Sequence, residues 1–356
     1  MKRIILILTL AAIFFSACNL NKDRKLSQQE VEALAKAHSD SIAVVLDSLR
    51  QINVFIPPLY DKEIFDSTTT TSFFDLAKAT NGELKLLVNS KLITTEIIDI
   101  IKSHASDNAD LLILMDKTGS MDDDIANVQK GLTQIINTIK TYHNVRLGIA
   151  LYGDKNEDGP DWFSFKNFET NYASAKEFIN QVEVTGGGDY PESVYDGFFK
   201  ACEQNFWKSD NKRMIILVGD APSLEKPLSD YTVSDVIKKA TENKIVMNFY
   251  PIVVTPVLGE EGAGGEGVAP VKTYEKAKLI TTVYPNPAVG MVNIDFAASG
   301  KYTVQVYDNS GTLIASENVT GNQWKKDVSG FKNGVYVVRV INEDKKFETS
   351  KFIVLK

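Results

Sequence analysis

The sequence predicts an α/β fold, a Rossmann-like doubly wound and mostly parallel sheet, followed by a small C-terminal all-β sandwich. Three observations support this fold class. Apolar runs alternate with amphipathic helical patterns between residues 108 and 256, as in repeated strand–helix units. Oxygen-bearing residues follow directly after two of these runs, where open α/β sheets place their ligands. Residues 281–356 instead show short strands with alternating apolar and polar positions.

The composition is that of a folded protein with room for two domains. Of the 356 residues, 44% are hydrophobic and 24% are charged, so at least one sizeable core can form. The formal net charge of -7 argues against non-specific nucleic-acid binding, and we expect no nucleic-acid partner. A mildly acidic surface is compatible with cation binding.

The N-terminus has the pattern of an export signal. Lys2 and Arg3 precede the apolar run 4–15, which is too short for a comfortable membrane span. Residues 15–18 resemble a bacterial lipobox, which implies that Cys18 is the lipid-carrying first residue of the mature chain. Ordinary secretion, with Cys18 removed, is the other interpretation. We assign residues 1–18 to a signal peptide with a lipobox-like end.

Residues 19–107 are predicted to be an N-terminal helical region and lead-in. Helical spacing of apolar residues extends from Ser27 to Ile52, and a capping box formed by Ser27 and Glu30 places the helix start near Gln28. This helix is either a stalk or packs on the main domain, and the sequence does not decide between the two.

The α/β domain is expected to span residues 108–256. Its apolar runs predict buried strands, and the intervening amphipathic patterns predict helices on both faces of the sheet. The helix after the first strand carries Ile125, Val128, Leu132 and Ile135 on one face. We predict strands at 111–115, 145–152, 214–219 and 244–254, and further helices at 173–182, 193–206 and 233–243.

A Gly- and Glu-rich linker, residues 257–280, is expected to separate this domain from the C-terminal region. Within residues 281–356, strands with period-two alternation are separated by Asn and Gly residues typical of turns. This pattern predicts a small β-sandwich. We place its strands at 291–296, 302–307, 334–340 and 347–355.

Oxygen-bearing side chains gather at the predicted carboxyl edge of the parallel sheet. Asp116, Thr118 and Ser120 leave the end of the first buried strand together, and Asp220 ends another apolar strand. A glycine-rich loop, residues 185–192, opens a helix between them. A carboxylate with two hydroxyls suits a small hard cation that accepts only oxygen ligands. The alternative is that these residues only cap helices and shape turns.

Three segments resemble the metal-ion-dependent adhesion site of von Willebrand factor type A domains. They are D-x-T-G-S-M at 116–121, G-G-G-D-x-P-E at 186–192 and D-A-P at 220–222. The resemblance implies a divalent cation, Mg²⁺ first and Ca²⁺ or Mn²⁺ as alternatives, that keeps one coordination position open. A carboxylate from an extracellular or surface protein ligand is expected to fill that position.

The same resemblance implies which side chains hold the cation: Asp116, Thr118, Ser120 and Asp220. The second-loop threonine of the common type falls at about residues 188–189 here, which is a departure from the family pattern. Asp189 is expected to supply that oxygen instead, and Thr185 is the other candidate.

Two further acidic segments leave alternatives open. Asp123 and Asp124 lie at the offset where some adhesion receptors of this family hold a second cation, or they are exposed acids in a first helical turn. Residues 154–159 fit the first half of a calcium loop, but Phe165 stands where the bidentate Glu belongs, so a solvated loop is the default expectation.

Residues 73–82 carry the pattern F-x-x-L-A-x-x-T-x-G. In type A domains a helix of this character usually comes last, whereas here it precedes the first motif strand. Either it packs where the terminal helix normally lies, in a partly permuted arrangement, or it is an unrelated lead-in helix.

The C-terminal region resembles the type A sorting domain of the type IX secretion system. The resemblance rests on Y-P-N-P at 284–287, Y-D-x-x-G at 307–311, G-V-Y at 334–336 and the final stretch 351–356. It implies recognition by an outer-membrane translocon, and hence a protein at the cell surface, in the outer membrane or secreted, in a Gram-negative bacterium. The anchor stays open.

We expect a binding protein and not an enzyme. His38, His104 and His143 lie outside the glycine-rich and strand-end motifs, and no nucleophile elbow, zinc-protease motif or phosphate loop occurs. The alternative is a surface scaffold whose metal only stabilises the loops. A metal-dependent hydrolase built on Asp116, Asp189 and Asp220 is the less favoured class.

Overall fold

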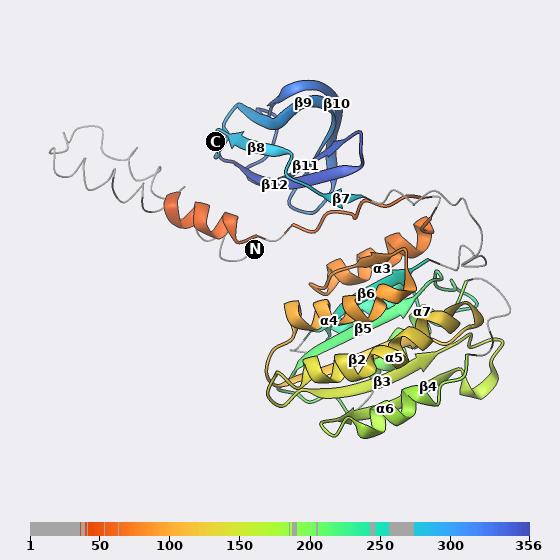
Figure 1. The fold of residues 1–356 in the computed structure, drawn as a ribbon. Coiled ribbons are helices and arrows are strands. Elements are labelled where there is room, and N and C mark those ends of the chain that lie inside the picture. The colour runs from red at the N-terminus through yellow and green to blue at the C-terminus, as the bar shows by residue number, and fades with distance from the viewer. Residues whose placement is uncertain are drawn as a thin grey trace. The chain divides into compact units, whose positions relative to one another are not determined.

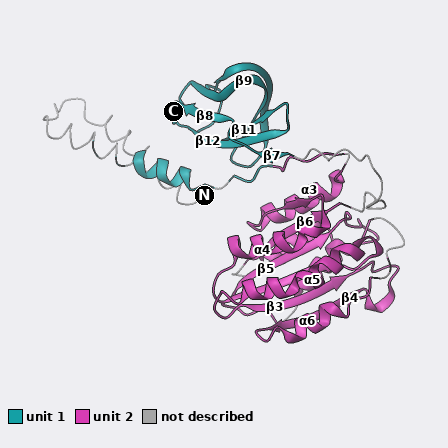
Figure 2. Ribbon diagram, in the orientation of Figure 1, with its two compact units in different colours: residues 1–56, 272–356 teal, residues 57–271 magenta. Residues whose placement is uncertain are grey.

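A computed structural model of the chain (Figure 1) describes residues 36, 40, 42–52, 54–62, 64–184, 186, 191–203, 206–242, 246–255 and 274–356. Two compact units are present (Figure 2): residues 57–271 form one, and residues 1–56 with 272–356 form the other. The predicted signal peptide with Cys18 lies outside the described residues. In the described ranges no helix combines the length and the apolar character needed to cross a membrane.

The α/β unit is built on one six-stranded sheet. Its strand order is β1-β6-β5-β2-β3-β4, and all neighbours are parallel except β4, which runs antiparallel to β3. This arrangement confirms the predicted Rossmann-like, mostly parallel sheet. The strands are β1 (Lys85–Leu87), β2 (Ala109–Asp116), β3 (Arg146–Tyr152), β4 (Phe163–Glu169), β5 (Lys212–Gly219) and β6 (Met247–Val254).

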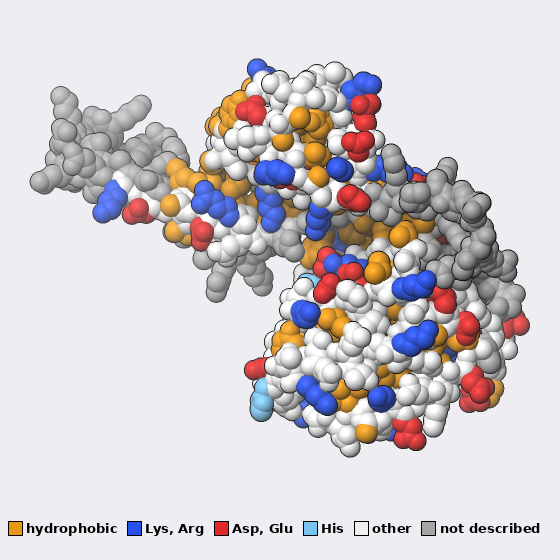
Figure 3. All heavy atoms as spheres, in the orientation of Figure 1, with side chains coloured by type: hydrophobic (Ala, Val, Ile, Leu, Met, Phe, Trp, Pro, Cys, Tyr) orange, Lys and Arg blue, Asp and Glu red, His pale blue; other side chains and the backbone are white. Residues whose placement is uncertain are grey.

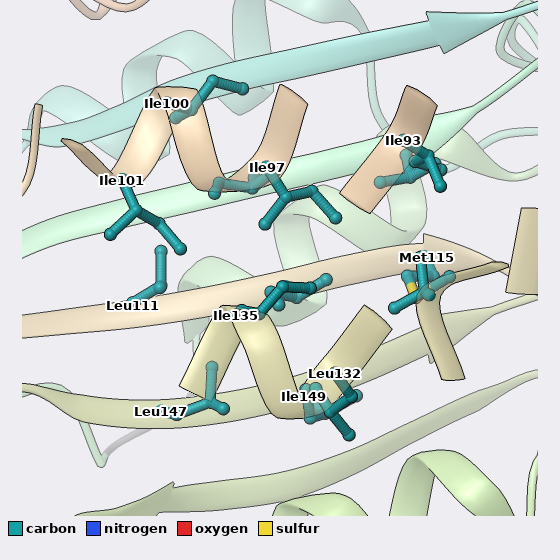
Figure 4. Packing of buried hydrophobic residues seen from close by; sticks show 14 of the residues in the cluster. Ile93, Ile97, Ile100, Ile101, Leu111, Met115, Leu132, Ile135, Leu147 and Ile149 are labelled. Atoms are coloured by element: carbon teal, nitrogen blue, oxygen red, sulfur yellow. The ribbon is translucent and has the colours of Figure 1, made fainter. Parts of the chain in front are cut away.

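Helices cover both faces of this sheet, which explains why β2 is buried along its whole length. Leu111, Ile113 and Met115 pack in one core cluster, whereas Leu112 and Leu114 pack in the other. Figure 4 shows the first cluster, in which isoleucines of α4 and α5 meet the strands. On that side lie α4 (Ile93–His104), α5 (Asp122–Ile139) and α6 (Ala173–Asn180), and on the other lie α3 (Ser67–Ala79), α7 (Val194–Glu203) and α8 (Val233–Thr241). Three short 3₁₀ turns are η1 (Ser90–Leu92), η2 (Gly119–Met121) and η3 (Gly159–Asp161).

Residues 57–107, which we expected to be a lead-in, are part of the α/β unit. Strand β1 pairs in parallel with β6, and α3 packs against β6 and α8. This segment closes the edge of the sheet beside the last strand of the core. Its position supports the partly permuted arrangement over an unrelated lead-in helix, because the segment comes first in sequence yet lies next to β6.

The pattern at 73–82 has a physical explanation in this docking. The backbone N–H of Phe249 donates to Thr80 Oγ1 at 3.0 Å, and Asn248 Nδ2 donates to the Thr80 carbonyl at 2.5 Å. A Cβ atom on Gly82 would lie 1.6 Å from the carbonyl oxygen of Phe249. The threonine therefore anchors the segment to β6, and the glycine permits the close backbone approach.

Strand β4 was not predicted from the sequence, where no strand was expected between residues 152 and 173. Phe163 and Phe165 lie on β4, and their rings pack partly buried against the second core cluster together with Trp162. Aromatic and polar residues alternate from Phe163 to Phe165, and this alternation is the sequence pattern that is typical of a strand. The sheet therefore extends one antiparallel strand beyond β3.

The C-terminal region is a β-sandwich, as predicted, made by one sheet that folds over itself. The strand order is β10-β9-β11-β12-β7. Strand β8 pairs with residues 293–296 of β9, whereas β11 pairs with residues 302–307 of β9. Gly300 and Gly321 oppose each other where the long strands β9 and β10 change register, so both strands bend there. The strands are β7 (Glu275–Lys276), β8 (Ile280–Tyr284), β9 (Met291–Tyr307), β10 (Leu313–Asp327), β11 (Gly334–Asn342) and β12 (Lys346–Val354). Strand β7 pairs with β12, so the unit begins inside the range assigned to the linker.

The N-terminal helix is described over residues 42–50 and packs on the β-sandwich. Both interpretations left open, a stalk and a helix on the α/β domain, are therefore wrong for this part of the chain. On the face of the molecule shown in Figure 3, basic and acidic side chains are interspersed, without a gathering of Lys and Arg.

We predict that Gly82→Ala destabilises the α/β unit, because its Cβ atom would collide with the backbone of β6. Overpacking of this kind typically costs about 1–3 kcal/mol or more. Chemical denaturation followed by far-UV circular dichroism measures the loss. Gly290→Ala is the matched control, because a Cβ there would meet nothing within 4 Å. Equal stability of the two variants would contradict the docking of residues 73–82 against β6.

Candidate metal centre

The ends of β2 and β5 bring two of the predicted site residues to one edge of the sheet. These strands are parallel neighbours with Met115 opposite Val218, so Asp116 and Asp220 leave the sheet side by side. The side chain of Asp116 is fully buried, and that of Asp220 is buried as well. Their convergence is the arrangement that the strand-end motifs predicted.

The glycine-rich loop is held at both ends by the other two motif segments. On one side, the N–H of Gly119 in η2 donates to the carbonyl of Gly186 at 3.2 Å. On the other side, the N–H of Glu192 donates to the carbonyl of Pro222 at 2.9 Å. Asp189 and Thr185 lie outside the described residues. The described flanks show that all three motif segments meet.

Asp116 uses only one of its carboxylate oxygens. Its Oδ1 accepts hydrogen bonds from the Thr118 N–H at 2.9 Å and from the Thr118 hydroxyl at 2.7 Å. Its Oδ2 is buried and has no hydrogen-bond partner within the described part of the chain. The same holds for Oδ1 of Asp220 and Oδ1 of Asp124. Buried carboxylate oxygens without partners are costly, so this site favours the arrival of a positive charge.

A second buried aspartate on the same strand shows how different this arrangement is. Asp110, at the amino end of β2, accepts two hydrogen bonds from the Arg146 guanidinium at 2.8 and 2.6 Å. It also accepts from the Lys208 N–H and from Asn211 Nδ2, each at 2.7 Å. The fold thus neutralises a structural aspartate at one end of β2, whereas Asp116 at the other end has hydrogen bonds from Thr118 but no ion pair with a basic residue in the described part of the chain.

The electrostatics of the site follow from this crowding of buried acids. Burial, and then the charge of Asp220, raise the pKa of Asp116 to about 7, although the two Thr118 donors oppose the shift. Burial also raises the pKa of Asp220, an effect that the Ser120 hydroxyl partly offsets. Burial, then Asp123, Asp220 and Asp116, raise the pKa of Asp124 to about 8. Raised pKa values of this kind are more frequent at functional sites than elsewhere.

Asp123 and Asp124, at the start of α5, differ in their burial. Asp124 is buried and senses the charges of Asp116 and Asp220, so it belongs to this cluster. Asp123 is half-buried beside it. The interpretation as exposed acids of a first helical turn is therefore wrong for Asp124, because the rotation of α5 turns its side chain inward.

The donor set fits a hard cation only if hydroxyl groups contribute. Across the described residues, no three Asp, Glu, His or Cys side chains gather closely enough to hold an ion by themselves. The buried oxygens of Asp116 and Asp220, the exposed hydroxyl of Ser120 and the buried hydroxyl of Thr118 lie on the two converging segments. Oxygen-only donors with an excess of negative charge are the chemistry that Mg²⁺ and Ca²⁺ require.

Two residues near the site were not predicted from the sequence. Tyr152 pairs with Asp116 across the strands, and its buried hydroxyl lies beside that carboxylate without the geometry of a hydrogen bond. Burial, and then the charges of Asp116, Asp220 and Glu192, raise the pKa of Tyr152 well above its usual range. A Cβ on Gly219 would lie 2.7 Å from this hydroxyl. The position of Tyr152 at the end of an apolar strand was the signal available in the sequence.

The segment 154–159 is a hydrogen-bonded turn. Asp154 Oδ1 accepts from the Asn156 N–H at 2.8 Å and from the Ser193 hydroxyl at 3.2 Å. Asp158 Oδ2 accepts from the Asp154 N–H at 2.8 Å. These carboxylates therefore shape the turn, and Phe165 lies on β4 instead of completing a calcium loop. The default expectation of a solvated loop is wrong for Asp154, which is buried in this turn.

Comparisons with known proteins agree with both units. Residues 110–256 match the family model of the von Willebrand factor A domain, and residues 282–355 match that of the secretion system C-terminal sorting domain. An alpha-protein kinase, vwkA, from Dictyostelium discoideum is 26% identical over 160 residues, or 44% of this chain. The chain spans only 25% of the length of that relative.

Two solved structures match parts of the chain at low identity. A von Willebrand factor type A protein from Catenulispora acidiphila is 13% identical, with 70% of this chain and 67% of that chain covered and a TM-score of 0.32. The pilus adhesin SpaC from Lactobacillus rhamnosus GG, in an open conformation, is 21% identical, with 32% and 15% covered and a TM-score of 0.27.

The fold and the family models define the class of protein. A von Willebrand factor A domain is followed by an all-β sorting domain of the kind that directs proteins to secretion or to the cell surface in Bacteroidetes, a Gram-negative group. The chain is therefore a secreted or surface protein that carries a von Willebrand factor A domain, and its sorting domain implies interaction with the type IX secretion machinery.

We predict that the metal-free protein loses stability as the pH rises from 5 to 8. Burial and neighbouring acids raise the pKa of Asp116 to about 7 and that of Asp124 to about 8, so both groups favour folding only while protonated. Their contribution is present below about pH 4 and is lost as the pH rises through 7 and 8. At about 1.4 kcal/mol for each pKa unit, we expect the two groups together to lower the free energy of unfolding by on the order of 5 kcal/mol, measured by denaturant unfolding in chelator.

Asp124→Asn should flatten this pH dependence, because it removes one of the two titrating groups. Asp122→Asn is the matched control, since Asp122 is exposed in the same helical turn. A flat profile in the unsubstituted protein, or identical profiles for the two variants, would contradict the assignment of Asp124 to the buried acid cluster.

Proposed function

We propose that this surface or secreted protein binds a divalent cation, Mg²⁺ first, and through it an extracellular protein ligand that offers a carboxylate. The residues proposed to hold the cation are Asp116, Thr118, Ser120 and Asp220, with Asp189 or Thr185 from the glycine-rich loop. The cation would supply an electrophilic position at the carboxyl edge of the sheet.

The contrast between Asp116 and Asp110 is the observation that carries this proposal. Both aspartates are fully buried on β2, but only Asp110 is neutralised by an arginine and two further donors. An unneutralised cluster of acids at a ligand-binding edge is difficult to explain by stability alone. A cation that these oxygens coordinate removes the electrostatic penalty.

The residues of the site divide into two groups by exposure. Asp116 and Thr118 are buried and suit the inner side of a coordination shell, whereas Ser120 is exposed and lies where a ligand can approach. Thr118 now donates its hydroxyl to Asp116, so its oxygen lone pairs stay available to a cation. This asymmetry supports a cation with its open side toward solvent.

A scaffold in which the metal only stabilises the loops is the second candidate. The Gly119–Gly186 and Glu192–Pro222 hydrogen bonds already connect the three motif segments through backbone atoms. We propose no catalytic role; His104 contacts Glu83 at 3.1 Å and its ring lies 4.6 Å from that of Tyr250, within the α/β unit.

Calorimetric titration of Mg²⁺, Ca²⁺ and Mn²⁺ into the chain from residue 19 onward tests the metal site. We expect saturable one-site binding that Asp116→Asn abolishes, since the amide retains an acceptor for Thr118 but removes the charge. Asp122→Asn is the control and should bind normally. Failure of the unsubstituted protein to bind any of the three ions would refute the proposal and leave the motifs as fold-forming turns.

The adhesion and scaffold hypotheses predict different effects of a chelator on ligand binding. Surface-immobilised protein should capture an acidic protein ligand from an extracellular protein library in Mg²⁺ and release it in EDTA. Asp116→Asn should fail to capture it in either condition. Capture that is unaffected by EDTA and by this substitution would favour the scaffold.

A further inference from the structure

The β-sandwich has a second apolar face outside its main core. Along β11, Tyr336 and Val338 point into that core, whereas the alternate residues Val335 and Val337 point to the opposite side. Two residues of neighbouring strands extend this second face: Tyr307 of β9 and Ile353 of β12. A small sandwich ordinarily presents polar residues on its outer sides, so this face requires a partner.

Residues 42–56 of the same chain cover this face. Leu49 and Val54 are each only 8% exposed and belong to the same buried cluster as Val335 and Val337. Val45, Leu46, Ile52 and Ile56 pack around them. The helix is amphipathic, because the charged residues Asp47 and Arg50 on its other side are exposed, although Val44 is also 57% exposed.

A polar contact fixes the end of the covering helix. Lys351 of β12 donates its Nζ to the carbonyl of Ile52 at 2.9 Å, just beyond the last helical residue. A cation at the carbonyl end of a helix is favourable, because the last carbonyls lack partners within the helix. The segment is therefore held by apolar contacts along its length and by a lysine at its end.

We propose that residues 42–56 are an intramolecular cover of the sorting domain, built to shield its second apolar face from association with other proteins. The face is a docking surface for a short amphipathic helix and the extended stretch that follows it. The segment that occupies it precedes the α/β unit in sequence. The described residues between 42 and 56 thus complete one compact unit with residues 274–356, although the α/β unit lies between them in sequence. The cation site plays no part in this inference.

A photo-crosslinking amino acid at position 49 tests the contact directly in the full chain. We expect crosslinks within one molecule to peptides that contain Val335, Val337 or Ile353, mapped by mass spectrometry. The same amino acid at position 44 is the matched control and should give none to these peptides. Crosslinks from position 49 only between two molecules, or to none of these strands, would overturn the proposal.

Leu49→Asp tests the energetic role of the cover. It should lower the unfolding midpoint of the β-sandwich by on the order of 5 °C and increase binding of a hydrophobic dye, while the transition of the α/β unit stays unchanged. Val44→Asp should match the unsubstituted protein in both respects. An unchanged sandwich transition in Leu49→Asp would overturn the proposal, and the α/β transition shows in the same scan that the chain has folded.

Discussion

The buried and uncompensated carboxylate of Asp116 is the constraint on which the α/β unit depends. It stands at the end of β2, a strand of apolar residues that is buried along its whole length, where a charge is costly unless it is paired. The surroundings are specialised to this position: Gly219 leaves room for the Tyr152 hydroxyl, and Gly119 brings the glycine-rich loop within one hydrogen bond. The opposite end of β2 shows the ordinary solution, in which Arg146 neutralises Asp110.

The sequence predicted those parts of the fold whose hydrophobic pattern is strong within a single segment and does not depend on a distant partner. The run through Met115 is apolar on both faces because both faces are buried, and such a run predicts a central parallel strand. Asp116, Thr118 and Ser120 could be placed at the edge because parallel strands end together. Strand β1 and helix α3 could not be placed in this way, since their partner, β6, is separated from them by most of the domain sequence.

Other features depended on orientations that a sequence pattern does not contain. Whether Asp124 faces solvent or the acid cluster is decided by how α5 rotates against the sheet, and Asp123, its neighbour in sequence, is more exposed. The amphipathic spacing of Val45, Leu46 and Leu49 predicted a buried helical face, but not the surface that buries it. That surface belongs to β11 and β12, near the other end of the chain, and no local propensity specifies such a pairing.

The proposed cation site would also couple ion binding to folding. An ion that binds only when Asp116, Asp220 and their loops are assembled stabilises the folded state in proportion to the logarithm of its concentration above its dissociation constant. The proposed ion would displace the proton that Asp116, with its raised pKa, retains near neutral pH, so its affinity would rise with pH. With the proposed site, the domain would be least stable where divalent ions are scarce and the pH is high.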